Sequence, residues 1–299
     1  MKTIPPRERL IFAMDVADPQ AARKLVETLG DSVEFYKIGL ELFMSGGYFE
    51  LLDWLAARGK KIFVDLKFFD VPATVAAAVR QLRSRGVTFA TVHGNQSIME
   101  AAAAAKGDVK VLAVTVLTSL DRGDLEDLGF TCDVEKLVLS RARRALEAGC
   151  DGVVSSGLEA KMLRQFVDDR LIVVTPGIRP VENRPSDDQK RVVTVEQAFT
   201  WGAAYIVVGR PIRDAADPRA MAESMQASAP VAGSPRHPPP AREDPDSRGR
   251  ALRRVLRNRK GRVHRKRGAG WARAAGAGDA LAHRPRDGYS ASRCGSVYR

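Results

Sequence analysis

Short apolar runs recur at regular intervals through residues 1–230 of the chain. Each run holds several Val, Ile, Leu or Phe residues and is bounded by residues that favour turns or helix caps. Each is therefore predicted to be a strand that is buried on both faces. The eight runs are Leu10–Val16, Phe35–Leu40, Lys61–Lys67, Phe89–Gly94, Lys110–Leu117, Gly152–Gly157, Ile172–Ile178 and Tyr205–Ile212.

The segments between these runs mostly repeat their apolar residues with the 3.6-residue period of an amphipathic helix. One helix is predicted over Pro19–Leu29, with Asp18 as its N-cap, proline at the first helical position and Gly30 at its end. A second is predicted over Pro72–Arg85 and is closed by Gly86. Strands and helices therefore alternate along this part of the chain.

Eight strand–helix units in about 230 residues are the number and size typical of a (β/α)8 TIM barrel, an α/β fold. A doubly wound open sheet is the alternative. It normally has fewer strands, and a dinucleotide-binding version carries a G-x-G-x-x-G motif after its first strand. No such motif follows Leu10–Val16. We therefore expect residues 1–230 to form one barrel domain.

The net charge of +12 is concentrated at the C-terminal end of the chain. Residues 231–299 contain 18 basic and 5 acidic residues, whereas residues 1–230 contain 30 and 31. Sixteen of the 18 basic residues are Arg, and Pro, Gly and Ala fill much of the remainder, which predicts a disordered tail. Translation of a GC-rich stretch in the wrong frame would give the same composition. The functional alternative is a basic tail that binds nucleic acid.

The chain shows no sign of secretion or membrane insertion. No run approaches eighteen consecutive apolar residues, and the start, Met1-Lys2-Thr3-Ile4-Pro5-Pro6, lacks the continuous apolar region of a signal peptide. The three cysteines are widely spaced and form no C-x-x-C pair, so neither a disulfide framework nor a zinc site is indicated. These features favour a cytoplasmic protein.

Chemically useful side chains collect at the ends of the predicted strands. In a (β/α)8 barrel the carboxyl ends of the strands form the working face, so we expect these residues to meet there. They are Asp15, Lys37, Asp65, Lys67, Asp70, His93, Thr118, Ser119, Arg179, Gly209 and Arg210.

Asp65 and Lys67 are the most informative of these residues, because two residues of separation places both side chains on the same face of a strand. That face must be the barrel interior. Carboxylates beside a buried lysine keep it protonated, so Lys67 is a candidate proton donor, with Lys37 as a second interior cation and Asp70 as a second anion. A purely structural ion-pair network and magnesium bound by Asp65 and Asp70 are the alternatives.

A second group of residues suits phosphate. Gly209 and Arg210 end the last predicted strand, where barrels often bind phosphate through backbone N–H groups and an arginine. Arg179 follows the seventh strand and opens a polar loop, residues 181–190, that is long enough to be a lid. His93 is the only histidine before the tail, and we interpret it as a hydrogen-bonded residue at the barrel end rather than a catalyst.

In these segments the chain closely resembles the orotidine 5′-monophosphate decarboxylase family. The resemblance runs through residues 8–228 and rests on seven motifs in order. They are L-I-F-A-M-D-V at Leu10–Val16, Y-K-I-G at Tyr36–Gly39, D-L-K-F-F-D-V-P-A-T at Asp65–Thr74, L-T-S at Leu117–Ser119, T-P-G-I-R-P at Thr175–Pro180, D-D-Q-K-R at Asp187–Arg191 and V-V-G-R-P-I at Val207–Ile212.

The resemblance implies decarboxylation of orotidine 5′-monophosphate to UMP and CO2, without a metal or cofactor, in a homodimer of barrels. Lys67 would be the general acid that protonates C6, and Asp65 would lie beside the substrate carboxylate. Lys37 would belong to the charged network, while Asp70 and Thr74 would be supplied across the dimer interface.

The resemblance also implies which residues bind the rest of the substrate. Asp15 and Lys37 would contact the ribose, and Thr118 would contact the pyrimidine. The residues on the phosphate side would be Arg179, Gln189, Gly209 and Arg210.

Two other functions remain open from the sequence alone. A sugar-phosphate decarboxylase or aldolase of the same wider barrel group shares a D-x-K-x-x-D strand but uses magnesium. A nucleic-acid-binding protein that acts through its basic tail is the non-enzymatic alternative.

Overall fold

The computed structural model describes residues 4–179 and 192–230. The basic segment 231–299 lies outside the described residues, so its disorder stays a prediction. None of the helices in the described part of the chain combines the length and apolar character needed to cross a membrane.

Eight parallel strands form a closed barrel in chain order. They are β1 (Leu10–Ala13), β2 (Phe35–Gly39), β3 (Lys61–Phe68), β4 (Val87–His93), β5 (Lys110–Val114), β6 (Gly152–Val154), β7 (Ile172–Thr175) and β8 (Tyr205–Val208). β8 closes the ring by pairing with β1, where Ile11 lies opposite Val207. The predicted (β/α)8 barrel is therefore confirmed.

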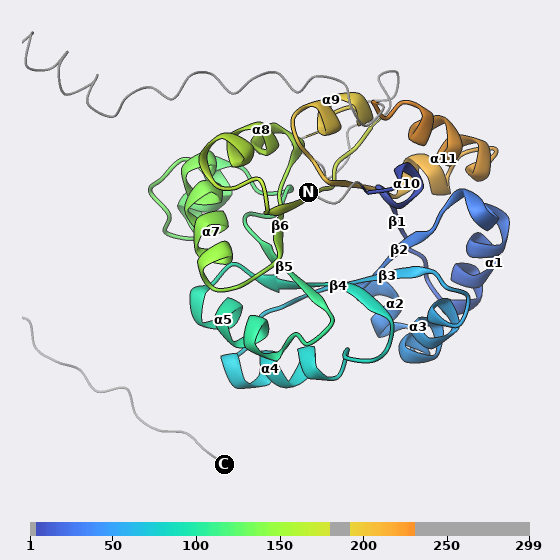
Figure 1. Cartoon of the computed structure of the whole chain (residues 1–299), viewed down its shortest axis with the longest axis horizontal. Helices are drawn as coiled ribbons and strands as arrows, with labels where there is room; N and C mark the ends of the chain where they lie inside the picture. Colours follow the sequence, from blue (N-terminus) through green and yellow to red (C-terminus); the bar gives the residue numbers. More distant parts are fainter. Residues whose placement is uncertain (1–3, 180–191, 231–299) are drawn as a thin grey trace, which may run out of the picture. The chain divides into compact units, whose positions relative to one another are not determined.

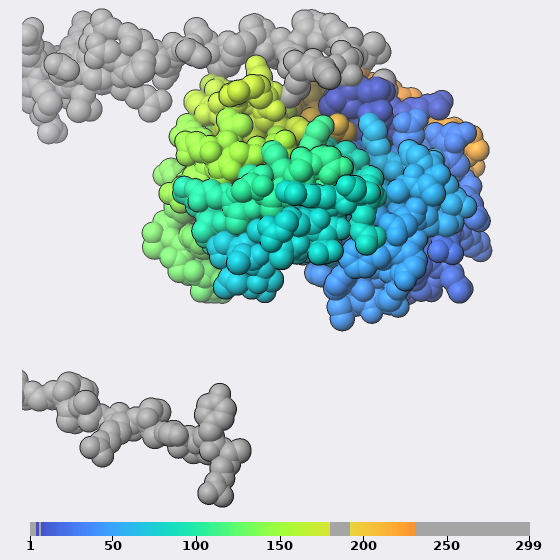
Figure 2. Space-filling model, turned by 60° about the horizontal axis from the view of Figure 1, so that its bottom comes forward, coloured from blue at the N-terminus to red at the C-terminus, as the bar shows by residue number. Residues whose placement is uncertain are grey.

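Helices surround the ring of strands (Figure 1). They are α1 (Pro19–Leu29), α2 (Leu40–Met44), α3 (Tyr48–Ala56), α4 (Pro72–Arg80), α5 (Gln96–Ala105), α6 (Arg122–Asp127), α7 (Val134–Glu147), α8 (Gly157–Phe166), α9 (Val195–Thr200), α10 (Arg210–Arg213) and α11 (Pro218–Ala227), with short 3-10 turns η1 (Pro6–Glu8) and η2 (Gly30–Ser32). Helices α4 and α5 pack side by side, and their residues form part of one face of the molecule (Figure 2).

Helix α1 shows how local sequence sets these boundaries. The Asp18 carboxylate accepts hydrogen bonds from the N–H groups of Gln20 and Ala21, and Pro19 occupies the first helical position. Gly30 follows the last turn with a φ of 53°, which favours glycine. Both predicted ends of this helix are confirmed.

Several predicted strands are wrong at their carboxyl ends, where they run too long. The predicted run to Val16 ends as a strand at Ala13, and the run to Ile178 ends at Thr175. Met14 and Ile178 are nevertheless fully buried, because the barrel mouth stays covered beyond the last strand pairing. The predicted helix Pro72–Arg85 likewise ends early, at Arg80, and residues 81–86 form turns.

The barrel interior is filled by apolar side chains from all eight strands. Phe89 lies at the centre of this layer, with ring centroids 5.1 Å from Phe35, 5.8 Å from Phe63 and 5.1 Å from Tyr205. Its contacts with Phe63 and Tyr205 are edge-to-face, which is a favourable geometry for aromatic pairs. These four rings form a closed aromatic layer across the barrel.

We predict that Phe89→Ala lowers the free energy of unfolding by about 3–5 kcal/mol, because it opens a cavity among rigid rings. Denaturation with urea would measure the loss, and Phe89→Leu, with a smaller expected loss, replaces it if the alanine variant does not fold. Phe166→Ala is the matched control, since Phe166 is 50% exposed. A loss for Phe89→Ala no larger than for Phe166→Ala would contradict the proposed central packing.

Candidate active site

Three neighbouring strands each place a polar side chain directly above the aromatic layer. Lys37, Asp65 and Thr91 each follow a phenylalanine of that layer by two residues, in β2, β3 and β4 respectively. Side chains two residues apart in a strand point to the same face, so all three polar groups enter the barrel from its wall. The aromatic rings below them exclude water from that side.

A chain of alternating charges connects the mouths of β1, β2 and β3. Lys37 Nζ lies 2.9 Å from Asp15 Oδ1 and 3.6 Å from Asp65 Oδ2. Lys67 Nζ lies 3.0 Å from the same Asp65 oxygen. The side chains of Lys37 and Asp65 are only 12% and 11% exposed, whereas Lys67 is 32% exposed. Lys67 is thus the lysine of this network that is more open to a substrate.

The network keeps Lys37 and Asp65 charged despite their burial. Burial opposes ionisation of Asp65, but Lys37 and Lys67, with a hydrogen bond from Thr91, hold its pKa below the ordinary value. Burial likewise opposes protonation of Lys37, but Asp65 and Asp15 raise its pKa above the ordinary value. A carboxylate and an ammonium therefore coexist inside the barrel at neutral pH.

Lys67 reaches this position through an irregular backbone rather than through regular strand alternation. Its φ is 48°, in the left-handed region that bulky residues rarely adopt. The pairing of β3 with β4 shifts register between Val64 and Phe68. Lys67 does lie beside Asp65, as predicted, but regular strand alternation does not account for it, because both residues belong to a bulge.

Asp70 and Thr74 lie on the segment that follows β3 and are both exposed. The Asp70 carboxylate accepts a hydrogen bond from the N–H of Val71. Within the described part of the chain it forms no ion pair with Lys67. A single barrel therefore leaves these two predicted site residues facing outward.

The residues predicted to contact the pyrimidine and the phosphate follow β5, β7 and β8. Thr118 and Arg179 are each 9% exposed, and Arg210 is exposed at the start of α10. A Cβ at Gly209 would lie 3.7 Å from Asp15 Oδ2, so this glycine borders the charged network. Gln189, the remaining predicted residue, lies outside the described residues.

His93 ends β4 and packs its ring against Phe69, with centroids 4.5 Å apart. Burial lowers its pKa, and the positive charges of Arg141 and Lys67 lower it further. A neutral imidazole is therefore favoured beside the lysine.

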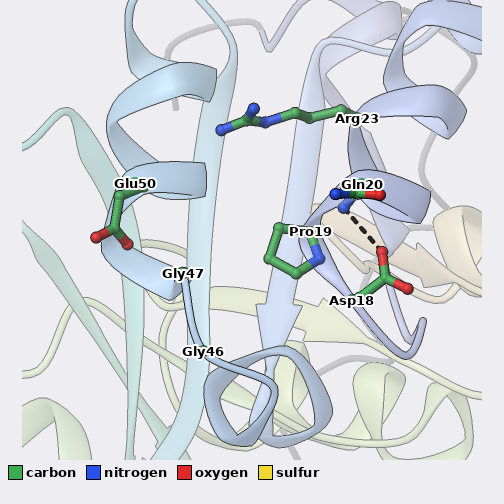
Figure 3. A pocket seen from close by; sticks show the side chains of 7 residues that line it. All are labelled: Asp18, Pro19, Gln20, Arg23, Gly46, Gly47 and Glu50. Atoms are coloured by element: carbon green, nitrogen blue, oxygen red, sulfur yellow. Dashed lines mark hydrogen bonds between the residues drawn. The ribbon is translucent and has the colours of Figure 1, made fainter.

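A recess of about 530 Å³ lies beside α1 and the loop between α2 and α3. Figure 3 shows the Asp18 carboxylate turned to its own helix and Arg23 extending from α1 toward α3. The guanidinium of Arg23 lies 5.4 Å from the Trp54 ring. None of the predicted site residues lines this recess, so it is distinct from the charged network.

Two further residues border the network and were not predicted from the sequence, Thr91 and Gly39. Thr91 is fully buried and bonds both to Asp65 and to the backbone of Lys67. A Cβ at Gly39 would lie 3.4 Å from Lys37 Nζ and 3.8 Å from Asp15 Oδ1. The signal for Thr91 was a polar residue within an apolar strand, two residues from Phe89 and from His93.

Comparison with known proteins agrees with this geometry. Residues 8–225 match the sequence model of the orotidine 5′-phosphate decarboxylase / HUMPS family. The chain belongs to this family. The match covers the barrel and ends within α11, close to the limits that the motifs indicated.

Individual relatives that this chain is similar to are named orotidine 5′-phosphate decarboxylase. The orotidine 5′-phosphate decarboxylase of Methylococcus capsulatus is 70% identical over 226 residues, which are 76% of this chain and 93% of that protein. The enzyme of the same name from Stenotrophomonas maltophilia is 53% identical, over 73% of this chain and 91% of that protein. The crystal structure of the Lactobacillus acidophilus orotidine 5′-phosphate decarboxylase is 35% identical, with a TM-score of 0.66 over 74% of this chain and 98% of that chain.

We predict that Lys37→Met destabilises the barrel by up to about 3 kcal/mol at neutral pH, because it removes one of the two lysines that pair with the buried Asp65 carboxylate. A carboxylate with a lowered folded pKa contributes stability above its ordinary pKa of about 3.9. That contribution is lost as the pH falls through the folded pKa of Asp65. The difference in the free energy of unfolding between parent and variant should therefore be largest above about pH 5 and smaller in acid.

Urea denaturation of both proteins from about pH 8 to about pH 3.5 would measure this gap. Lys136→Met is the matched control, because the Lys136 side chain is 76% exposed and its pair with Asp133 lies on the surface. If the loss of unfolding free energy in Lys37→Met stays constant across this pH range, the pairing of Lys37 with Asp65 contributes nothing to stability.

Proposed function

We propose that this protein is a carboxy-lyase that converts orotidine 5′-monophosphate to UMP and CO2 in pyrimidine biosynthesis, with Lys67 protonating C6. The observation that carries the proposal is the Lys37–Asp65–Lys67 network at the barrel mouth, in a chain that is 70% identical to a protein named for this activity. The D-x-K-x-x-D strand alone would also fit a sugar-phosphate enzyme.

The chemistry explains why a fixed ammonium is needed. Loss of CO2 from C6 leaves an electron pair in the plane of the pyrimidine ring, where the π system cannot delocalise it. Positive potential must therefore come from outside the ring. Lys67 Nζ, held 3.0 Å from Asp65, supplies that potential and then the proton for C6, so the proposed reaction uses no cofactor.

The remaining proposed contacts follow the positions of the side chains around the network. Asp15 and Lys37 bind the ribose, Asp65 lies beside the substrate carboxylate and Thr118 contacts the pyrimidine. The proposed phosphate group of residues is Arg179, Gln189, Gly209 and Arg210. Binding of the phosphate, far from C6, contributes energy that orients the ring against Lys67.

We also propose that two chains form a homodimer and complete each other's sites. Met44, Phe69 and Val71 are 78%, 64% and 62% exposed, and they belong to the segments that follow β2 and β3. Large exposed apolar side chains in such a group favour a protein partner. Asp70 and Thr74 lie on the same exposed segment, so a second chain packed there would receive them.

A cytoplasmic location is part of this proposal. Within residues 4–179 and 192–230, Cys132 and Cys150 form no disulfide, and Cys150 is buried. Unpaired cysteines are typical of proteins in a reducing compartment.

We predict that the full-length protein consumes orotidine 5′-monophosphate in the presence of EDTA and that Lys67→Ala reduces this rate by at least about a thousandfold. The ultraviolet absorbance of the substrate would follow the reaction. Lys161→Ala is the control, because Lys161 lies exposed on α8. Activity that EDTA removes from the parent would favour the magnesium-dependent sugar-phosphate class instead.

Sharing of sites between subunits predicts complementation. Lys67→Ala and Asp70→Ala chains should each be inactive as homodimers, whereas a mixed dimer contains one site with an intact lysine and an intact aspartate. Unfolding and refolding the two variants together should restore about a quarter of the parent activity. Mixtures that stay inactive, with dimers confirmed by light scattering, would place both residues in the same subunit's site.

A further inference from the structure

Thr91 joins the backbone of one proposed site residue to the side chain of another. Its Oγ1 accepts the N–H of Lys67 at 2.9 Å and donates its proton to Asp65 Oδ1 at 2.9 Å. The side chain is fully buried in β4, between Phe89 below it and His93 above it on the same face. A hydroxyl has one proton to donate, so acceptance from the amide leaves that proton for the carboxylate.

The strand pairing explains why Lys67 needs such a partner. Val64 lies opposite Ala90, and Phe68 lies opposite Val92. Between these pairs β3 contains Asp65, Leu66 and Lys67, whereas β4 contains Thr91 alone. The extra residues form a bulge, and the Lys67 N–H bonds to the threonine side chain within it.

The bulge also contains the unusual backbone of Lys67. A non-glycine residue at a φ of 48° persists only where surrounding contacts hold it. Thr91 supplies one such contact from a neighbouring strand, and its β-branched side chain has a restricted χ1 angle. The hydroxyl therefore fixes the direction in which the lysine side chain leaves the strand.

The Asp65 carboxylate is held from three sides. Oδ1 accepts from Thr91 of β4, while Oδ2 faces Lys67 of β3 at 3.0 Å and Lys37 of β2 at 3.6 Å. Without the Thr91 contact the carboxylate could rotate about its χ2 angle, which is a broad torsion. The lysine ammonium would then lose its fixed partner.

We propose that Thr91 is a positioning residue that holds the bulge of β3 and the Asp65 carboxylate in register, so that Lys67 Nζ stays aimed at the reacting carbon. This inference rests on the proposed function, because it acts through Lys67 and Asp65. Thr91 itself is fully buried, so in this proposal it acts through these two neighbours.

Thr91→Val tests the proposal, because it removes the hydroxyl and keeps the shape of the side chain. We expect kcat for orotidine 5′-monophosphate to fall about 10- to 100-fold while KM stays within about threefold, since substrate binding groups are unchanged and only alignment is lost. Thr91→Ser restores the hydroxyl and should return kcat to within about threefold of the parent. Thr91→Ala replaces the valine variant if that variant does not fold.

Thr175→Val is the matched control for loss of a buried hydroxyl. Thr175 is also fully buried, in β7, and its Oγ1 has no hydrogen-bond partner in the described structure. It follows Val174, which points into the barrel, so its own side chain lies on the opposite face of the strand. This variant should keep the parent kinetics.

Two further readouts separate positioning from general stability. The hydrogen bond from Thr91 favours the ionised form of Asp65, so its loss should move the acid limb of the kcat–pH profile to higher pH in Thr91→Val but not in Thr91→Ser. Exchange of the Lys67 amide hydrogen should accelerate in Thr91→Val, because that amide loses its acceptor.

The outcomes are distinguishable. Turnover by the parent and an undiminished kcat in Thr91→Val would overturn the inference and leave the proposed function intact. If Thr91→Val and Thr175→Val lower kcat alike and the pH profile does not change, the role of Thr91 is structural only. That result would also overturn the inference. A parent protein that does not turn over orotidine 5′-monophosphate would overturn the proposed function and this inference together.

Discussion

The structure of the barrel mouth depends on one carboxylate, Asp65, that is shared by two lysines. A buried carboxylate is unfavourable unless cations and hydrogen-bond donors surround it. Lys37 and Lys67 supply the charges, and Asp15 in turn balances Lys37. Each member of this series of alternating charges requires its neighbours, so the three strand ends are fixed relative to one another.

The aromatic layer beneath the network increases the strength of these interactions. Charges attract more strongly where water is excluded, and the rings of Phe35, Phe63 and Phe89 close the barrel below the three polar side chains. In each of these three strands, an aromatic residue of the core is followed two residues later by a polar residue of the site. Stability of the core and arrangement of the site are consequently properties of the same short segments.

Local sequence was sufficient to predict the architecture and much of the network. Apolar runs identified all eight strands, and two-residue spacing predicted that Asp65 and Lys67 lie together, with Lys37 as a second interior cation. What local sequence could not show was the bulge at Lys67, because it depends on the register between β3 and β4. Thr91 was missed for the same reason, since its importance lies in a residue 24 positions away. Strand ends were placed too far along the chain because burial continues past the last backbone pairing.

Closure of the ring connects the two ends of the folded domain at the site. Arg213 of α10 donates a hydrogen bond to the backbone carbonyl of Asp15 at 2.7 Å, across 198 residues of sequence. Lys37, Asp65 and Lys67 come from consecutive strands, whereas Asp15 is joined to Arg213 only when β8 pairs with β1. Contacts of such long sequence separation carry a large loop-closure entropy and form slowly. The hydrogen bond from Arg213 to Asp15 is therefore the contact of the site most sensitive to any change that weakens the pairing of β8 with β1.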